Sequence, residues 1–358
     1  MSKFYPLRVA GVRNETRDTI AVTFDVPAEL ADSFKYQQGQ HLTLRATIGG
    51  EDVRRSYSIC SAVQDNLLRV AIKKTSGGMF STWANESLKP GDVLEVMPPM
   101  GHFNVQLAPG NAKHYVAFAA GSGITPILSI IKTTLNEEPN SLFTLFYGNR
   151  ASSTVIFKEE LTDLKDTHMQ RLNLAYVMSR EQQDIELFNG RITKEKVEHL
   201  LQHWISIDDI DVAFICGPED MMLGVSAALQ EAGLPKQSIK IELFAASIPK
   251  HEHKPRAFDP AVAHDTEVTV IMDGSHTTFT MEKDKESILD AGLRHGIDMR
   301  YSCKGGVCST CRCKLLDGKV DMDVNYALED YEIARGFVLS CQSFPVTDKV
   351  VVDFDQAE

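Results

Sequence analysis

Hydrophobic and polar positions alternate over short distances in the first part of the 358-residue chain. Up to about residue 108, turn signals such as Gly49, Gly50 and "KPGD" separate the runs "HLTLRATI", "SYSIC", "LLRVAIKK" and "DVLEVMPP". Short strands divided by turns are typical of a small antiparallel barrel. We therefore predict an antiparallel β-barrel over residues 1–108.

Residues 109–244 follow a second pattern, in which apolar strand-like runs alternate with helix-like stretches. The strand-like runs are "HYVAFAA", "SLFTLFYG", "LNLAYVMS", "DVAFICG" and "IKIELF". Helix-like stretches such as "TKEKVEHLLQHW" and "PEDMMLGVSAALQEAG" lie between them. This alternation predicts an α/β domain, a parallel sheet covered by helices on both faces.

The last third of the chain begins with a segment that has no clear period. Residues 245–265 contain three prolines and are interpreted as a linker. His251 and His253 lie in it, and a solvated linker is preferred over a metal site for this pair. Residues 266–358 place strand-like runs such as "EVTVIMDG" and "KVVVDF" around the helix-like "ESILDAGLRHG", which predicts a compact α+β domain.

Charge and cysteine content limit the possible functions. A net charge of -12 and a pI near 5.4 argue against nucleic acid as a partner, because phosphate binding needs clustered Lys and Arg. The uncharged run "HYVAFAAGSGITPILSII" is broken by Gly and Pro, so no membrane span is predicted. The N-terminus has no apolar signal segment, so a cytoplasmic location is expected. Five of the seven cysteines lie in the last 60 residues, which favours a metal site over disulfides.

Four of these cysteines have the ligand spacing of a plant-type [2Fe-2S] ferredoxin, CxxxxCxxC followed by a distant cysteine: Cys303, Cys308, Cys311 and Cys341. Zinc is the alternative, but its usual sites pair two CxxC-like halves. Gly305 and Gly306 would let the backbone approach the sulfides. Cys313 is interpreted as a buried structural thiol, with a ligand role as the alternative.

Charged residues around this loop lead to two further expectations. Four basic residues are expected to favour the reduced cluster: Arg300, Lys304, Arg312 and Lys314. Residues 266–358 nevertheless hold 17 Asp and Glu against 10 Lys and Arg, a net charge of -7. A charged rim of this kind suits docking to a complementary partner, although an ordinary solvated surface remains the alternative.

A flavin would connect this cluster to a nicotinamide cofactor, because a hydride carries two electrons and the cluster accepts one at a time. The motif "RSYS" resembles the RxYS signature of the ferredoxin-NADP reductase family. The resemblance implies that Arg55 pairs with flavin phosphate, that Tyr57 packs on the isoalloxazine ring and that Ser58 hydrogen-bonds near N5. Without the other motifs, a plain cross-strand aromatic would explain Tyr57 equally well.

Further motifs extend the resemblance. In "GGMFSTW", the family implies that Gly78 and Ser81 open a helix that holds the FAD pyrophosphate, with Phe80 on the flavin side. "GSGITP" resembles the GxGxTP loop of the same family, which implies that three residues bind the nicotinamide cofactor: Gly121, Gly123 and Thr125. "CGPED" implies that Cys216 lies beside the nicotinamide and the flavin and that Gly217 shapes the turn; a buried structural cysteine is the alternative.

The nicotinamide preference depends on the segment "SRE". NADP-using members of the family place Ser and Arg at this point to bind the 2'-phosphate, which implies Ser179 and Arg180, with Arg191 as a possible helper. NADPH is therefore expected over NADH, although a surface arginine at a strand end is also common where no phosphate binds. Plant members of the family end in an aromatic residue that lies over the flavin, whereas this chain continues past that point. Phe244 in "IELF" is the candidate for the same place.

Together these motifs cover essentially the whole chain, which resembles flavin reductases with a plant-type ferredoxin domain fused at the C-terminus. The resemblance implies a multidomain protein: an antiparallel β-barrel FAD domain, an α/β parallel-sheet nucleotide domain and an α+β β-grasp ferredoxin domain. Electrons from NADPH would pass through FAD and the [2Fe-2S] cluster to an oxygenase component with di-iron epoxidase subunits, since this chain has no di-iron ligand set of its own. The alternatives are a reductase of a hybrid-cluster protein or another iron-sulfur acceptor, and a redox sensor without turnover.

Overall fold

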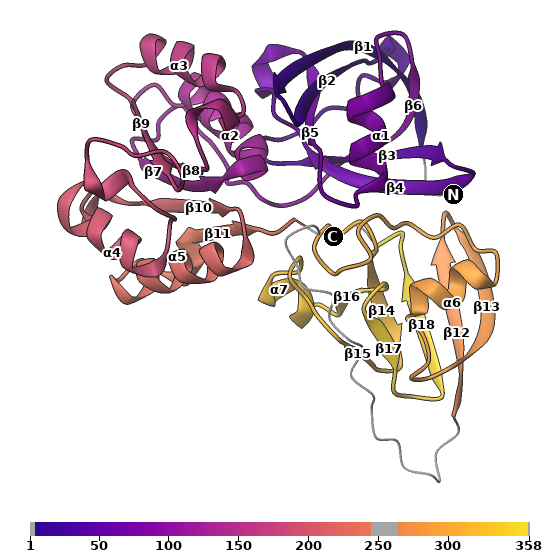
Figure 1. Cartoon of the computed structure of the whole chain (residues 1–358). Coiled ribbons are helices and arrows are strands. Elements are labelled where there is room, and N and C mark those ends of the chain that lie inside the picture. The colour runs from indigo at the N-terminus through magenta and orange to yellow at the C-terminus, as the bar shows by residue number, and fades with distance from the viewer. Residues whose placement is uncertain (1–3, 245–263, 357–358) are drawn as a thin grey trace. The chain divides into compact units, whose positions relative to one another are not determined.

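The computed structural model describes residues 4–244 and 264–356 (Figure 1). These residues form two compact units. The N-terminal unit comprises residues 5–53 and 57–244, and the C-terminal unit comprises residues 264–356 with residues 4 and 54–56. Most of the segment interpreted as a linker, including His251 and His253, lies outside the described residues.

The first part of the N-terminal unit is a six-stranded antiparallel sheet in the order β4-β3-β6-β1-β2-β5. Its strands are β1 (Tyr5–Thr16), β2 (Thr19–Asp25), β3 (His41–Ile48), β4 (Glu51–Ser58), β5 (Leu68–Lys73) and β6 (Val93–Met100), and helix α1 (Met79–Ser87) follows β5. A bridge between Ile59 and Val70 connects the chain just after β4 to β5, which curls the sheet toward a barrel. Apolar side chains of alternating strand positions fill its interior.

The second part of the N-terminal unit is a five-stranded parallel sheet in the order β11-β10-β7-β8-β9. Its strands are β7 (His114–Ala120), β8 (Leu142–Asn149), β9 (Leu172–Met178), β10 (Val212–Cys216) and β11 (Ile239–Glu242). The helices are α2 (Ile124–Glu137), α3 (Lys158–Thr167), α4 (Lys194–His203) and α5 (Glu219–Glu231). Helices α2 and α3 cover one face and α4 and α5 the other, as Figure 1 shows. When the strands are renumbered in chain order with β7 as strand 1, their order across the sheet is 3-2-1-4-5. Strands β8 and β9 lie on one side of β7, and β10 and β11 lie on the other. The strand order therefore reverses between β7 and β10.

The two sheets of the N-terminal unit share a core and an ion-pair network. Cys60 and Ala71 from the first sheet pack in the same buried cluster as the face of the parallel sheet under α2 and α3. Arg69 of β5 donates to both carboxylate oxygens of Glu160 on α3 at 2.8 Å, and Lys132 of α2 donates to the same carboxylate at 2.8 Å. These contacts hold the carboxyl ends of the parallel strands at a fixed position relative to the first sheet.

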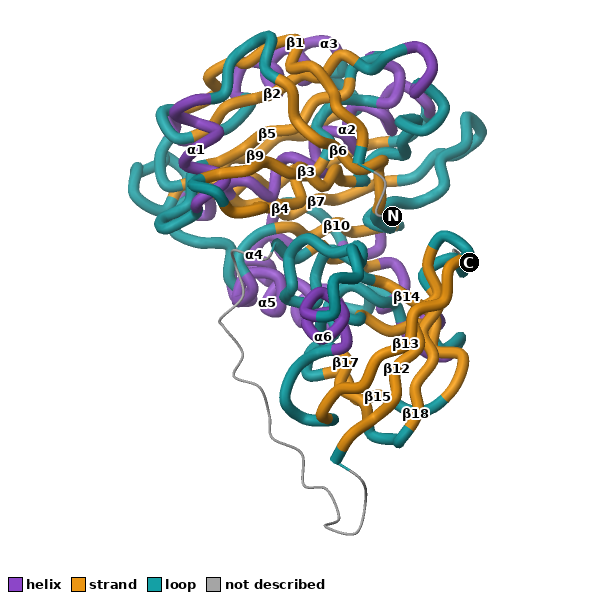
Figure 2. The backbone as a smooth tube through the Cα atoms, turned by 90° about the vertical axis from the view of Figure 1, so that its right-hand side faces the viewer, coloured by secondary structure: helices purple, strands orange, loops and turns teal. Residues whose placement is uncertain are grey.

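The C-terminal unit is an α+β domain with a five-stranded mixed sheet in the order β13-β12-β18-β14-β16 and a second sheet of two strands (Figure 2). The strands are β12 (Asp265–Met272), β13 (Ser275–Glu282), β14 (Arg312–Asp317), β15 (Val320–Met322), β16 (Phe337–Leu339), β17 (Ser343–Pro345) and β18 (Lys349–Asp353), and the helices are α6 (Ile288–Arg294) and α7 (Asp330–Ala334). Apolar residues of α6, such as Ile288, pack against Val268 and Val352 of the sheet. Strand β12 begins at Asp265, the last residue assigned to the linker.

Candidate functional site

Strand β4 and helix α1 bring together two of the predicted flavin residues, Tyr57 and Phe80. Arg55 and Tyr57 lie two positions apart on β4, so their side chains leave the same face of the strand. The Tyr57 ring lies 5.7 Å from the ring of Phe80 on α1, measured between centroids. Phe80 is fully buried, whereas Tyr57 is only partly covered and can offer an aromatic surface to a flat ligand.

The N-terminus of α1 forms a tight cradle. A Cβ atom at Gly78 would lie 2.2 Å from Thr75 Oγ1 and 2.5 Å from Ser81 Oγ, so a larger residue would displace both hydroxyls. Ser81 is buried and its hydroxyl donates to the Gly78 carbonyl at 3.2 Å. The N-cap residue is Gly78, which has no side chain to cap the helix, so the first backbone N–H groups are able to bind an anion. The cradle therefore fits the pyrophosphate of a dinucleotide.

After β7, a second glycine lets two backbone segments approach each other closely. Gly121 has φ +54° and Gly123 ends the short turn that leads into α2. A Cβ at Gly123 would lie 2.0 Å from the carbonyl oxygen of Cys216, the last residue of β10. The two strand ends therefore meet where the strand order reverses, the usual ligand-binding place in such sheets. Thr125 is buried and donates to the Ser122 carbonyl at 3.0 Å, so its hydroxyl stabilises the loop.

Three side chains from different strands converge beside this loop. Cys216 ends β10, and its register partner on the neighbouring strand is Glu242, the last residue of β11. Ser58, the last residue of β4, donates its hydroxyl to the Glu242 carboxylate at 3.3 Å. Glu242 did not enter the sequence-based site. The sequence feature that could have identified it is a single acidic residue at the carboxyl end of the apolar strand in "IKIELF".

Burial sets the protonation of this group of residues. The Glu242 carboxylate is enclosed by protein atoms, although the residue keeps some exposed surface, and this burial raises its pKa to about 8. Burial also raises the pKa of the Cys216 thiol, with a smaller contribution from the charge of Glu242. Cys216 therefore stays a neutral thiol near neutral pH, and Glu242 is largely protonated there.

Glu242→Gln is expected to make the protein more stable than the wild type at alkaline pH. With a pKa of about 8, folded Glu242 retains a proton that the unfolded chain releases near its ordinary value of about 4.3. The free energy of unfolding therefore falls as pH rises through this window, and the neutral amide removes the loss. Thermal unfolding between about pH 5 and pH 9 should show a Tm difference that widens with pH. The exposed Glu29→Gln is the control, and parallel Tm curves for E242Q and wild type would contradict the assignment.

The carboxyl ends of β8 and β9 carry the predicted nicotinamide-selecting residues. Ser179 and Arg180 are exposed directly after β9, and the Arg180 N–H donates to the Arg150 carbonyl at 2.8 Å. The Glu181 carboxylate accepts from the backbone N–H and the hydroxyl of Ser152, at 2.8 and 2.9 Å. These bonds fix the path of the loop while the Arg180 guanidinium faces solvent. Among residues 4–244 and 264–356, no ion pair of Arg180 or of the exposed Arg191 is recorded.

Two further predicted residues have clear surroundings. Gly217 follows β10, and a Cβ there would lie 2.5 Å from the flexible end of the Met221 side chain, so a larger residue would displace that side chain. Phe244 is partly buried and packs against the core that contains Cys216.

In the C-terminal unit, the four predicted ligand cysteines form two pairs. The Cys303 N–H donates to Cys308 Sγ at 3.5 Å, and the hydrogen bond between the two thiols lowers the pKa of Cys303 to about 7. Cys311 and Cys341 form the second pair, and their hydrogen bond raises the pKa of Cys311. The Gly305 N–H donates to Cys303 Sγ at 3.3 Å. The loop thus combines thiols with backbone donors, as an iron-sulfur cluster requires.

This pairing suits two metal ions better than one. A [2Fe-2S] cluster takes two thiolates at each iron, whereas zinc takes four ligands at one centre. Cys313 has a different partner: it is fully buried on β14, and its Sγ lies 3.8 Å from the Val338 carbonyl.

The structure revises the expected effect of the basic residues near this loop. Three of the four lie in ion pairs: Arg300 with Asp273 at 3.3 Å, Lys304 with Asp290 at 2.7 Å and Arg312 with Glu332 at 2.8 Å. A paired charge acts at a distance as a dipole, so these residues contribute much less positive potential than their number suggested. The net acidity of the domain is therefore the more important long-range property.

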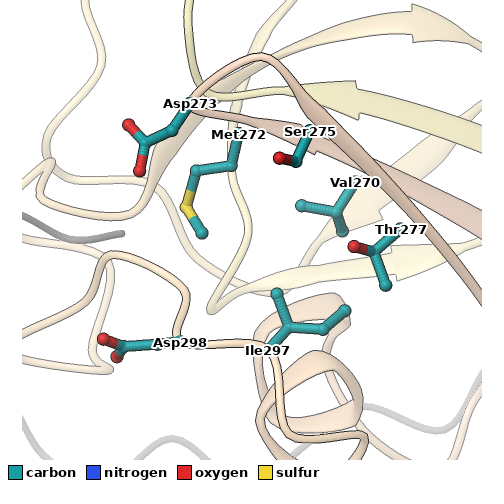
Figure 3. A pocket seen from close by; sticks show the side chains of 7 residues that line it. All are labelled: Val270, Met272, Asp273, Ser275, Thr277, Ile297 and Asp298. Carbon is teal, nitrogen blue, oxygen red and sulfur yellow. The ribbon is translucent and has the colours of Figure 1, made fainter.

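A pocket in the C-terminal unit is separate from these sites. Figure 3 shows the apolar side chains of Val270, Met272 and Ile297 lining the pocket, with the carboxylates of Asp273 and Asp298 on one side of it. Ser275 and Thr277 complete the lining. None of these residues is a cysteine of the cluster loop or belongs to the flavin or nucleotide motifs.

The fold and these sites define a class: a flavin-dependent NAD(P)H reductase that carries its own iron-sulfur domain. Models of three families match successive parts of the chain. An oxidoreductase FAD-binding domain matches residues 6–105, an oxidoreductase NAD-binding domain matches residues 118–227, and a 2Fe-2S iron-sulfur cluster binding domain matches residues 270–346. The chain belongs to the family of oxygenase reductase components that join these three domains.

Relatives of known function match the chain over nearly its full length. A subunit of 1,2-phenylacetyl-CoA epoxidase from Escherichia coli is 46% identical over 355 residues, which is 99% of each chain. The ferredoxin reductase component of 3-ketosteroid-9-alpha-monooxygenase from Rhodococcus rhodochrous is 35% identical over 97% of this chain and 96% of the relative. The protein is thus an oxidoreductase that serves as the reductase component of an oxygenase.

Solved structures agree on the architecture. Phthalate dioxygenase reductase, described as a modular structure for electron transfer from pyridine nucleotides to [2Fe-2S], matches with a TM-score of 0.57 and 22% identity over 98% of both chains. An intact type IV self-sufficient cytochrome P450 monooxygenase matches with a TM-score of 0.68 and 22% identity, over 98% of this chain and 41% of that one. None of the helices in the described residues combines the length and apolar character that a membrane span needs.

Proposed function

We propose that this protein transfers electrons from NADPH, through FAD and a [2Fe-2S] cluster, to the oxygenase component of a phenylacetyl-CoA epoxidase. The observation that carries this proposal is the 46% identity to the Escherichia coli epoxidase subunit over 99% of both chains, compared with 35% to the 3-ketosteroid monooxygenase reductase. The oxygenase would carry the di-iron centre, and the reaction would take place in the cytoplasm. The two thiol pairs and the glycine cradles of the chain support the electron path.

When bound, FAD would supply hydride acceptance and one-electron release, and the cluster would supply single-electron transfer. The cradle at Gly78 and Ser81 would hold the flavin pyrophosphate, with Arg55 pairing with phosphate. Tyr57 and Phe80 would cover the flat ring. The four ligands of the cluster would be Cys303, Cys308, Cys311 and Cys341.

The residues at the strand ends would orient the two ring systems. Gly121 and Gly123 would admit the NADPH pyrophosphate to the loop backbone, with Thr125 holding the loop in shape. Cys216, which stays a neutral thiol, would pack beside the nicotinamide and exclude water. Ser58 would hydrogen-bond near flavin N5, and its bond to Glu242 fixes its orientation. Gly217 and Phe244 would close the pocket at β10 and β11.

Arg180→Ala is expected to raise the KM for NADPH on the order of tenfold or more and to leave that for NADH nearly unchanged, because a charge-assisted bond to the 2'-phosphate contributes about 1.5–3 kcal/mol. Steady-state reduction of an artificial acceptor with each cofactor measures this. Arg17→Ala, at an exposed position in the turn after β1, is the matched control. Equal effects of R180A on both cofactors would remove Arg180 from this role.

Reconstitution with purified oxygenase components tests the proposed partner. With the phenylacetyl-CoA epoxidase oxygenase subunits, the protein should support NADPH-dependent epoxidation of phenylacetyl-CoA. With the oxygenase component of 3-ketosteroid-9-alpha-monooxygenase, product formation should be at least about tenfold lower, which corresponds to about 1.4 kcal/mol of discrimination. Comparable support of both systems, or support of the second alone, would overturn the assignment of the acceptor. Sustained NADPH oxidation with cytochrome c, measured in parallel, would separate a reductase from a redox sensor.

A further inference from the structure

Gln342, the residue after the last cysteine of the cluster loop, makes contacts that none of the motifs explains. Its side-chain amide donates from Nε2 to Cys341 Sγ at 3.7 Å and to the Lys304 carbonyl at 2.9 Å. One amide group therefore contacts a sulfur of the second thiol pair and the backbone of the loop that carries the first pair. We infer that Gln342 tunes the [2Fe-2S] cluster and fixes its loop; this inference rests on the proposed cysteine ligands.

The two thiol pairs receive different kinds of hydrogen-bond donor. At the first pair, backbone N–H groups of Cys303 and Gly305 donate to the sulfur atoms. At Cys341, a side-chain amide donates to the sulfur atom, that of Gln342. Backbone donors survive most substitutions, but this donor is removed by changing one side chain. Gln342 is therefore the position at which a sulfur hydrogen bond can be tested directly.

The Gln342 side chain lies beside Gly306, and backbone hydrogen bonds fix the chain at both residues. The Gln342 Cγ atom lies 3.2 Å from the position that a Cβ atom of Gly306 would occupy, and Gly306 has φ +75°. The Gln342 carbonyl accepts from the Asp323 N–H at 3.0 Å, and the Gly306 carbonyl accepts from the Tyr326 N–H at 3.0 Å. The residue thus connects the cysteine loop, the segment after β15 and the chain at Cys341.

Electrostatics gives the direction of the effect. An amide N–H directs its positive end at the thiolate and stabilises the more negative, reduced state of the cluster. Loss of the donor should therefore make the reduction potential more negative. Gln342 is partly exposed, so water weakens the effect. Loss of the bond to Lys304 should also loosen the loop and speed the release of the cluster.

The test compares Gln342→Met with Gln356→Met in the full-length holoprotein. Methionine keeps the length of the side chain and removes the donor, and Gln356 is an exposed residue of the same domain after β18. The readouts are the midpoint potential of the cluster, the EPR spectrum of its reduced state and the half-life of its visible absorbance with an iron chelator. In Q342M the equilibrium constant for one-electron reduction of the cluster should fall by up to about tenfold. The midpoint potential would then shift by up to about 59 mV to more negative values.

The outcomes separate this inference from the ligand proposal. A shifted potential with faster cluster loss in Q342M alone supports the role of Gln342. An unchanged potential in Q342M, or equal shifts in Q342M and Q356M, overturns it while the ligand assignment stands. If wild-type protein shows no [2Fe-2S] EPR signal, the ligand proposal fails and this inference fails with it. If Q342M takes up no cluster, Gln342→Asn replaces it, because the shorter amide cannot span both acceptors; a wild-type potential in Q342N would then overturn the inference.

Discussion

Cys341→Ser is expected to give a protein that still passes electrons from NADPH to ferricyanide but no longer reduces cytochrome c at a substantial rate. Cys341 pairs with Cys311, so its loss leaves one iron with a single thiolate from the chain. Changes in residues that only support metal ligands already cost about 10- to 100-fold in affinity, and loss of a ligand should cost more. Iron content and the EPR signal of the reduced protein should fall together, while FAD content stays at the wild-type value.

Cys313→Ala is the matched control for this prediction. Cys313 is buried on β14 and does not belong to either thiol pair, so its replacement should lower stability modestly and leave the cluster in place. A C313A protein that loses its cluster while C341S keeps it would show that the fourth ligand was assigned to the wrong cysteine. Zinc in place of iron in the wild-type protein would contradict the cluster assignment altogether.

The sequence predicted strands correctly where buried side chains alternate with exposed ones or follow one another without a break. Strands β3 and β7 have the bounds of the predicted runs, His41–Ile48 and His114–Ala120, because side chains on one or both faces are apolar. Strand β1 (Tyr5–Thr16) was not among the predicted runs. Five of its twelve residues are exposed, among them the charged Arg13, and register shifts near Gly11 and Glu15 interrupt its alternation.

In the candidate site, the sequence revealed residues of short motifs but not contacts between residues far apart in the chain. Gly78 and Gly123 could be found in the sequence because each belongs to a short motif, and at Gly123 the backbone of Cys216 leaves no room for a side chain. The contact of Ser58 with Glu242 joins positions 184 residues apart and depends on how the two sheets pack. The pairing of Arg312 with the buried Glu332 likewise depends on tertiary structure, so a count of basic residues overestimated their effect on the cluster.

Gly123→Ala is expected to lower the rate of flavin reduction by NADPH about 100-fold. The new Cβ would lie 2.0 Å from the Cys216 carbonyl oxygen and 2.6 Å from its carbonyl carbon, and neither atom belongs to a flexible side chain. The strand ends of β7 and β10 must therefore separate, and a displacement of about 1 Å at a reacting centre costs about 100-fold in rate. Overpacking of this kind should also lower the free energy of unfolding by about 1–3 kcal/mol. Stopped-flow flavin reduction and denaturant unfolding measure the two effects.

Gly110→Ala is the matched control, because a Cβ there meets nothing within 4 Å and the position lies in the same part of the unit. Dithionite should reduce the flavin of G123A as fast as that of the wild type, since the chemical reductant does not depend on the nucleotide loop. If G123A and G110A both react with NADPH at the wild-type rate, the approach of the loop to Cys216 does not position the nicotinamide. If G123A also loses FAD, the glycine stabilises the whole unit, and the specific role in hydride transfer is contradicted.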